Sequence, residues 1–144
     1  MTLIVVKVNT RILDKLRHEL RGRLENVVKK TAFDIEAEGK RGSPVDTGAN
    51  RSSIYTTLSD GGDSYSPAAS AARSQRPGLP LQSPRSVEGD KIEARIGPST
   101  FYGILLEFGT TTMAARPYMT PALERSREPF LAAIKAVIEE ARRG

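Results

Sequence analysis

The stretch "LDKLRHELRGRLENVVKKTAFDI", residues 13–35, decides the fold, because its apolar residues recur at steps of three and four. This spacing places them along one side of an α-helix and leaves lysine, arginine and glutamate on the other side. The apolar stripe consists of Leu13, Leu16, Leu20, Leu24, Val27, Val28, Thr31 and Ile35. We therefore predict one long amphipathic helix over residues 11–40, which Gly39, Gly42 and Pro44 bring to an end.

Four shorter segments have the character of β-strands. Residues 3–8 are apolar and β-branched, which is typical of a buried strand. Residues 51–59 and 91–97 alternate between two faces, as in a sheet that is solvated on one side, and residues 101–108, "FYGILLEF", form a further apolar run. In residues 91–97 we expect alternate side chains to point inward and outward, with Ile92, Ala94 and Ile96 inside and Lys91, Glu93 and Arg95 outside.

The last part of the chain is predicted to be a second amphipathic helix. Thr120 is an N-cap residue type, and Pro121 suits the first helical position. Pro129 lies inside the helical pattern and should kink or divide the helix. The fold class that follows is α+β, with an antiparallel sheet of about four strands packed against a long N-terminal helix and a C-terminal helix. We expect residues 1–144 to form a single domain.

Residues 60–90 separate two of the predicted strands and are rich in glycine, serine, proline and alanine. They have no helical or strand periodicity, so we predict a long flexible loop or arm between the strands. Arg73, Arg76 and Arg85 make its centre basic. Two interpretations stay open: a loop without a function of its own, or an arm that becomes ordered on a partner or on DNA.

Composition excludes several kinds of site. The chain has no cysteine, and His18 is its one histidine, so disulfides, thiolate zinc sites, two-histidine metal sites and most catalytic triads are excluded. We predict no metal site and no cofactor. No apolar run is long enough to span a bilayer, and the opening "MTLIVVKV" has no signal-peptide features. The net charge of +5 is spread along the chain and only weakly favours acidic partners or nucleic acid.

The string "VDTG", Val45 to Gly48, permits two interpretations. Asp-Thr-Gly is the active-site string of retroviral-type aspartic proteases, in which two chains each supply one aspartate. The residues before it, "EGKRGSP", are unlike the buried strand that such a site needs, and two long helices do not belong in that small all-β fold. We interpret the string as a turn in which Asp46 caps backbone N–H groups, Gly48 adopts a positive φ and Val45 anchors the turn to the core. Asp46 and Thr47 are then structural, and we predict no enzymatic activity.

Three strings in order resemble the HK97 gp10-like family of tailed-phage proteins: "SPVDTGANRSSI" from residue 43, "YGILLEFGT" from residue 102 and "ARPYMTPALE" from residue 115. Members of that family typically contain PVDTG-x-L-R-x-S-I, then EFGT, then ARPF or a relative that leads into PAL. The resemblance covers nearly the whole chain except residues 60–90. Asn50 stands where the family usually has leucine, so we expect one core contact to be lost or rearranged.

The resemblance implies a structural protein of the virion, made in the host bacterial cytoplasm, at the neck or the top of the tail. Such a tail-completion or head–tail joining protein would form a ring of about six or twelve copies around the DNA channel. Its partners would be further copies of itself, neighbouring head-closure, tail-terminator or tail-tube proteins, and packaged DNA; no catalysis, cofactor or membrane is implied. The alternative is a basic DNA-binding accessory protein or assembly factor that uses Arg73, Arg76 and Arg85.

Single residues of these strings have expected structural roles. For Glu107 two interpretations remain: a solvated strand end, or an ion pair with Arg51 or Arg116 that fixes the following loop. We expect Phe108 and Tyr102 to pack in the core or at the sheet edge. Gly109 should serve the geometry of the loop, and Arg116 with Pro117 should lead the chain into the last helix.

Overall fold

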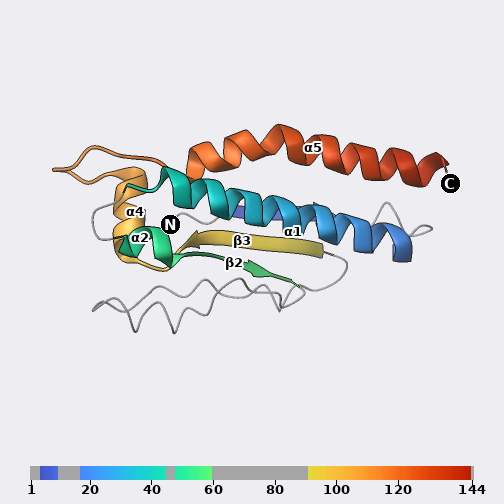
Figure 1. Ribbon diagram of the computed structural model, residues 1–144, viewed down its shortest axis with the longest axis horizontal. Coiled ribbons are helices and arrows are strands. Elements are labelled where there is room, and N and C mark those ends of the chain that lie inside the picture. Colours follow the sequence, from blue (N-terminus) through green and yellow to red (C-terminus); the bar gives the residue numbers. More distant parts are fainter. Residues whose placement is uncertain (1–3, 10–16, 45–47, 60–90, 144) are drawn as a thin grey trace.

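The computed structural model describes residues 4–9, 17–44, 48–59 and 91–143 of the chain. In chain order the elements are β1 (Ile4–Asn9), α1 (Arg17–Gly42), α2 (Ala49–Ser53), β2 (Ile54–Leu58), β3 (Lys91–Pro98), α4 (Phe101–Phe108) and α5 (Met119–Arg143). Figure 1 shows α1 and α5 as two long helices beside an antiparallel sheet, so the predicted α+β class is confirmed. The predicted loop over residues 60–90 lies outside the described residues.

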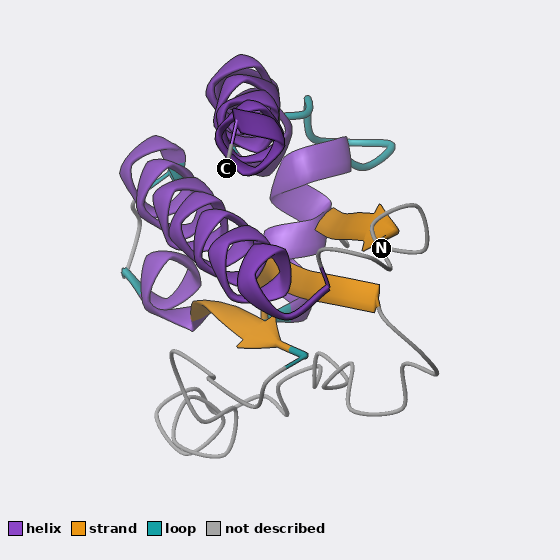
Figure 2. Cartoon of the chain, turned by 90° about the vertical axis from the view of Figure 1, so that its right-hand side faces the viewer, coloured by secondary structure: helices purple, strands orange, loops and turns teal. Residues whose placement is uncertain are grey.

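The helices and the sheet form successive layers, with α1 in the middle. One side of α1 packs on β2 and β3, and its other side packs along α5 (Figures 1 and 2). The predicted apolar stripe is confirmed for Leu20, Leu24, Val28, Thr31 and Ile35, which are all buried. The remaining core comes from the sheet, from α4 and from the start of α5, through Ile54, Leu58, Ile92, Ala94, Ile96, Leu106, Tyr118, Met119 and Ala122.

Within the described residues the sheet has three strands in the order β1–β3–β2, and both pairings are antiparallel. Ile4 of β1 lies opposite Ile96, and Ile54 of β2 lies opposite Pro98, so β3 is the central strand. The strands predicted near residues 3–8 and 91–97 are confirmed. The segment predicted as one strand over residues 51–59 instead starts in the short helix α2 and becomes β2 at Ile54.

The prediction of a solvated sheet face was wrong in part. Lys91 is exposed as expected, but Glu93 is buried, and its carboxylate accepts a hydrogen bond of 2.9 Å from Nε of Arg95. Tyr55 and Thr57, on alternate positions of β2, are buried as well. An alternating pattern shows which residues share a face of a sheet, but it does not show whether that face is covered.

The apolar run predicted as a fourth strand is helix α4. A short, mainly apolar run of this length fits either structure, and the flanking residues decide between them. The hydroxyl of Thr100 accepts a hydrogen bond from the N–H of Gly103, which is an N-cap interaction, and Gly109 ends the helix with its N–H bonded to the Leu105 carbonyl. The buried residues of α4 accordingly have helical spacing: Gly103, Leu106 and Glu107.

Helix α5 starts at Met119, one residue before the predicted cap, and continues through Pro129 as one element with a bend (Figure 1). Its side that faces α1 carries Leu123, Phe130, Ile134 and Val137, which are partly buried against the core. An ion pair of 3.0 Å between Arg23 and Glu140 links the exposed surfaces of the two helices. No helix in the described part of the chain is long and apolar enough to cross a membrane.

Candidate functional site

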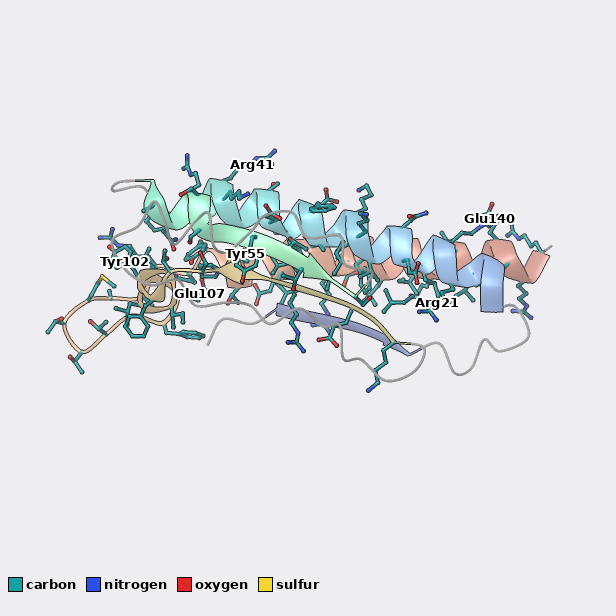
Figure 3. The ribbon with its side chains drawn as sticks, turned by 90° about the horizontal axis from the view of Figure 1, so that it is seen from below. Arg21, Arg41, Tyr55, Tyr102, Glu107 and Glu140 are labelled. Carbon is teal, nitrogen blue, oxygen red and sulfur yellow. The ribbon has the colours of Figure 1, made fainter. Side chains whose placement is uncertain are left out.

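Segments that are far apart in the sequence meet at one end of the molecule. There α2 and α4 both lie near the end of α1 where α5 begins (Figure 1), and Asn50 of α2 is in close contact with Gly103 of α4. Figure 3 shows Glu107 and Tyr102 at this end, and Arg21 and Glu140 toward the other. The three strings that resemble the phage family, which begin at residues 43, 102 and 115, all contribute described residues to this junction. We therefore take the junction as the candidate site.

The buried carboxylate of Glu107 is the centre of the junction between α4 and α5. Its Oε2 accepts the backbone N–H groups of Tyr118 at 2.9 Å and of Met119 at 3.0 Å. Its Oε1 accepts the backbone N–H of Thr120 at 2.9 Å, as well as the hydroxyl of the same residue. The first N–H groups of a helix have no partner within the helix and carry a partial positive charge, so Glu107 acts as the cap of α5 from a different helix.

The pKa of Glu107 reflects this environment. Burial by itself raises the pKa of the carboxyl group, because it disfavours the charged form. The hydrogen bonds from Thr120, Tyr118 and Met119 favour the carboxylate and outweigh burial, so the pKa is lowered from its ordinary value. Glu107 is thus held as an anion at neutral pH.

Both sequence interpretations of Glu107 were wrong. The side chain is only 3% exposed, which excludes a solvated end of an element. Arg51 and Arg116 are exposed, and neither forms an ion pair with Glu107 in the described part of the chain. Arg116 instead donates its backbone N–H to the carbonyl of Leu106 at 2.7 Å, which brings residues 116–118 against the end of α4. The backbone of Arg116, and not its side chain, therefore leads the chain into α5.

Asn50 of α2 joins a second set of buried polar groups. Its amide Nδ2 donates to Oγ of Ser43 at 2.8 Å, just beyond α1. Its Oδ1 accepts from the hydroxyl of Thr100 at 3.1 Å and faces the hydroxyl of Tyr118 at 3.4 Å. The Tyr118 hydroxyl donates more closely to the carbonyl of Gly103, at 3.1 Å. One amide therefore connects the end of α1, the cap of α4 and the start of α5.

This network explains how the chain accommodates an asparagine where the resemblance leads us to expect leucine. Asn50 is buried, as a leucine would be, but hydrogen bonds replace the apolar contact. Close packing accompanies them, because a Cβ added to Gly103 would collide with Oδ1 of Asn50 and lie 2.7 Å from Pro98. Burial raises the pKa of Tyr118 to about 12, its hydrogen bond to Asn50 opposes the shift, and the charge of Glu107 adds to it.

Two glycines of the strings have the geometry that the sequence predicted. Gly48 has φ of 75° and directly precedes α2, which confirms the positive φ expected there. Gly109 also has φ of 75°, and a Cβ at this position would lie 2.8 Å from the Met113 carbonyl oxygen. A side chain is disfavoured at Gly109 for both reasons. Val45, Asp46 and Thr47, and likewise Arg73, Arg76 and Arg85, lie outside the described residues.

The expectation that Phe108 and Tyr102 pack in the core or at the sheet edge was wrong, because both lie on helix α4 with their side chains largely exposed. Phe108 is 61% exposed, and Tyr102 is 44% exposed. Pro117 is exposed too, between the exposed Arg116 and the buried Tyr118. The structural roles of Thr100 and Tyr118 were not predicted, although Thr100 directly before an apolar run is a helix-start signal.

The described residues offer little for catalysis or metal binding. Each buried carboxylate among the described residues forms hydrogen bonds or an ion pair: Glu36 with Lys40 and Thr56, Glu93 with Arg95, and Glu107 with the start of α5. In this part of the chain, no group of three or more His, Cys, Asp or Glu residues could hold a metal ion. An open groove of about 370 Å³ lies between α1 and α5 near Pro129, but charged side chains of its wall form ion pairs, as between Lys30 and Asp34.

Comparison with known proteins identifies one family. A family model described as "Bacteriophage HK97-gp10, putative tail-component" matches residues 10–109. The match spans α1 to α4 and ends at Gly109, so the third string, which leads into α5, lies beyond it. No curated protein and no solved structure matches the chain.

Proposed function

Since the chain belongs to the HK97-gp10-like family of bacteriophage tail components, we propose that it is a structural protein of the virion at the neck or the top of the tail. There it completes the tail or joins the tail to the head. A tail component is part of the virion and contacts other phage proteins. We further propose that the chain has no catalytic activity.

Beside family membership, one observation supports this proposal: the described residues of the strings that resemble the family have structural roles. Glu107 and Gly109 of "LEFGT" fix the orientation of α5 relative to α4, and Gly48 turns the chain into α2. These residues build the junction, and among the polar groups of the junction that the structure describes, those of Glu107, Asn50, Thr100 and Tyr118 are used in hydrogen bonds that hold it together. The same junction presents exposed aromatic side chains to solvent, which is typical of a protein that binds other proteins.

Assembly as a ring of about six or twelve copies around the DNA channel is part of the proposal. Rings form when two different surfaces of one chain bind each other repeatedly around an axis. The neighbours along the axis would be head-closure, tail-terminator or tail-tube proteins. The net charge of +5 is compatible with a position close to packaged DNA.

The test is a measurement of copy number in intact particles. Particles made by the phage or prophage that encodes this chain are purified, and the chain is quantified against the major capsid protein by mass spectrometry. We expect a small fixed number, about six or twelve copies per particle. Deletion of the gene should leave heads and tails that do not join, or tails that are incomplete.

Absence of the chain from mature particles would overturn the proposal and favour an assembly factor that binds DNA. That alternative predicts duplex binding that weakens with salt, with a shallower salt dependence after Arg73, Arg76 and Arg85 are replaced by alanine. Peptide cleavage that Asp46→Asn abolishes would instead establish a protease.

A further inference from the structure

Helix α5 is fastened to the rest of the protein most firmly at its start. Among its described residues, the buried ones are Met119 and Ala122, both in the first turn. The carboxylate of Glu107 accepts the first N–H groups of the helix. The sulfur of Met119 lies so close to α1 that a Cβ added to Gly39 would be 2.6 Å from it. The first part of α5 is therefore bonded to α4 and packed tightly on α1.

Pro129 interrupts the hydrogen bonds of α5 beyond this first part. Proline has no N–H group, so Pro129 cannot donate the hydrogen bond that the carbonyl of Arg125 would accept in an unbroken helix. The proline ring also crowds the preceding turn, which is a common cause of a bend such as the one in α5 (Figure 1). The backbone of α5 therefore consists of two hydrogen-bonded units, residues 119–128 and residues 129–143.

Helices α1 and α5 do not pack closely where these two units meet. The open groove of about 370 Å³ lies there, and its lining includes Val27 and Thr31 of α1 and Ser126, Pro129 and Ala133 of α5. Close packing holds two helices together through many small dispersion contacts, and atoms that border an open groove lack such contacts on one side. The groove thus separates the tightly packed start of α5 from the contacts that follow Pro129.

The unit beyond the proline is held more weakly. Three of its apolar side chains pack against the core, but each is only partly buried: Phe130, Ile134 and Val137. The ion pair between Arg23 and Glu140 joins side chains that are 49% and 70% exposed. Exposed ion pairs contribute little to stability, because water screens the charges and both side chains lose freedom. Release of this unit from α1 therefore breaks fewer favourable contacts than release of the first unit.

We infer that Pro129 is a hinge, about which residues 130–143 open and close as one unit while residues 119–128 stay docked. The closed form is the one described above. In the open form, the side chains of Phe130, Ile134 and Val137 leave α1 together. This opening needs less free energy than global unfolding, because the sheet and the junction at Glu107 stay intact. The inference concerns the chain by itself and does not depend on the proposed function.

Amide hydrogen exchange of the full-length protein, measured residue by residue by NMR, tests the hinge. After correction for intrinsic rates, we expect residues 130–141 to exchange through one common opening, about tenfold or more faster than residues 119–128. The change in protection should be a step at Pro129. Ordinary fraying of a helix end would instead give protection that declines gradually toward Arg143, and this result would overturn the inference. Uniform protection along α5 would overturn it as well.

The natural absence of cysteine allows a second measurement, because an introduced cysteine is the only thiol in its chain. Leu123→Cys and Val137→Cys place a thiol at two partly buried positions that pack against the core, one before Pro129 and one after it. Each rate of reaction with a small thiol reagent is compared with the rate in the unfolded protein. We expect Val137→Cys to react about tenfold or more faster than Leu123→Cys. Equal rates would contradict the hinge.

Replacement of the proline separates its effect from that of distance along the helix. Pro129→Ala restores the hydrogen bond to the Arg125 carbonyl, so it should slow the reaction of Val137→Cys by about tenfold or more and leave Leu123→Cys unchanged. Glu128→Ala is the matched control, since it introduces the same side chain at the neighbouring exposed position and keeps the proline. An unchanged rate at Val137→Cys after Pro129→Ala, or equal slowing by Glu128→Ala, would overturn the inference.

Discussion

The carboxylate of Glu107 on α4 accepts both the backbone N–H and the hydroxyl of Thr120 at the start of α5. A residue at the start of a helix usually provides its own cap, and here the chain leaves that task to a side chain of another helix. The interaction caps α5 and at the same time fixes the angle at which α5 leaves α4. Loss of Glu107 should therefore affect the whole junction.

Glu107→Ala is expected to lower the free energy of unfolding by about 3 kcal/mol, because it leaves the first N–H groups of α5 buried without an acceptor. Urea unfolding followed by circular dichroism measures the change. Glu124→Ala is the matched control, since it removes an exposed carboxylate from the first turns of α5, and it should change stability by no more than about 0.5 kcal/mol. Equal effects of the two substitutions would contradict the capping role.

Acid should weaken the same interaction. The pKa of Glu107 is lowered from its ordinary value of 4.5, so the stability that it contributes is present above pH 4.5 and is lost as the pH falls through its lower folded-state value. We expect the stability difference between wild type and Glu107→Gln to be largest near neutral pH and to shrink below pH 4.5. Unfolding midpoints in urea from pH 7 downward provide the measurement, and a difference independent of pH would refute the assignment.

Tyr118 makes the opposite prediction at alkaline pH. Burial raises its pKa from 10.0 to about 12, so its protonated hydroxyl contributes stability that is complete below pH 10.0 and is lost as the pH rises toward 12. Tyr118→Phe removes the hydrogen bond to Gly103 and should cost about 1 kcal/mol at neutral pH. The difference in unfolding free energy between wild type and Tyr118→Phe should become smaller above pH 10.0, as measured by guanidinium unfolding. A difference that does not change with pH would mean that burial does not raise the pKa of the Tyr118 hydroxyl.

Two glycines should respond to alanine in opposite directions. Gly22 lies in the middle of α1, where an added Cβ meets no atom within 4 Å, so Gly22→Ala should stabilise the protein by about 0.5–1 kcal/mol. Gly109→Ala should destabilise it by about 1–3 kcal/mol, because φ is positive and the Cβ would approach the backbone of residues 113–115. Thermal unfolding of both variants checks the signs, and a stable Gly109→Ala protein would contradict the described turn.

Neighbouring threonines of β2 form another matched pair. The hydroxyl of Thr56 donates to the buried carboxylate of Glu36 at 2.7 Å, so Thr56→Val should cost about 2 kcal/mol. The buried Oγ1 of Thr57 has no hydrogen-bond partner in the part of the chain that the structure describes. Thr57→Val should therefore raise stability by about 0.5–1 kcal/mol. If chemical denaturation shows that Thr57→Val is the more damaging change, its hydroxyl has a partner after all.

The sequence was sufficient to locate the long helices and the central strand, because the apolar residues of each recur along one stripe or one face. Leu24, Val28 and Ile35 repeat at helical spacing, and Ile92, Ala94 and Ile96 repeat at strand spacing, so each set marks the core side directly. Residues 101–108 were different, because Glu107 is the one charged residue in a mainly apolar segment, and a single charge does not mark a polar side. Thr100 and Gly109, just outside the run, contained the information that identifies the helix.

The roles of Glu107 and Phe108 could not be predicted for another reason. A capping carboxylate is recognised through its donors, and those of Glu107 come 11 to 13 residues later, after a turn whose path the sequence does not specify. Phe108 is apolar, so burial was the natural expectation. Its exposure depends on how α4 is oriented, and Glu107, Leu106 and Gly103 together orient the opposite side inward.

The pairing of β1 with β3 has a consequence for how the chain folds. Ile4 lies opposite Ile96, so this part of the sheet joins residues near the start of the chain to residues two thirds of the way along it. Contacts of such high order require the closure of a large loop, whose entropic cost slows their formation. The junction of α4 and α5, in contrast, is closed by partners 11 to 13 residues apart. The junction of α4 and α5 can thus form with a much smaller loop-closure cost than the pairing of β1 with β3.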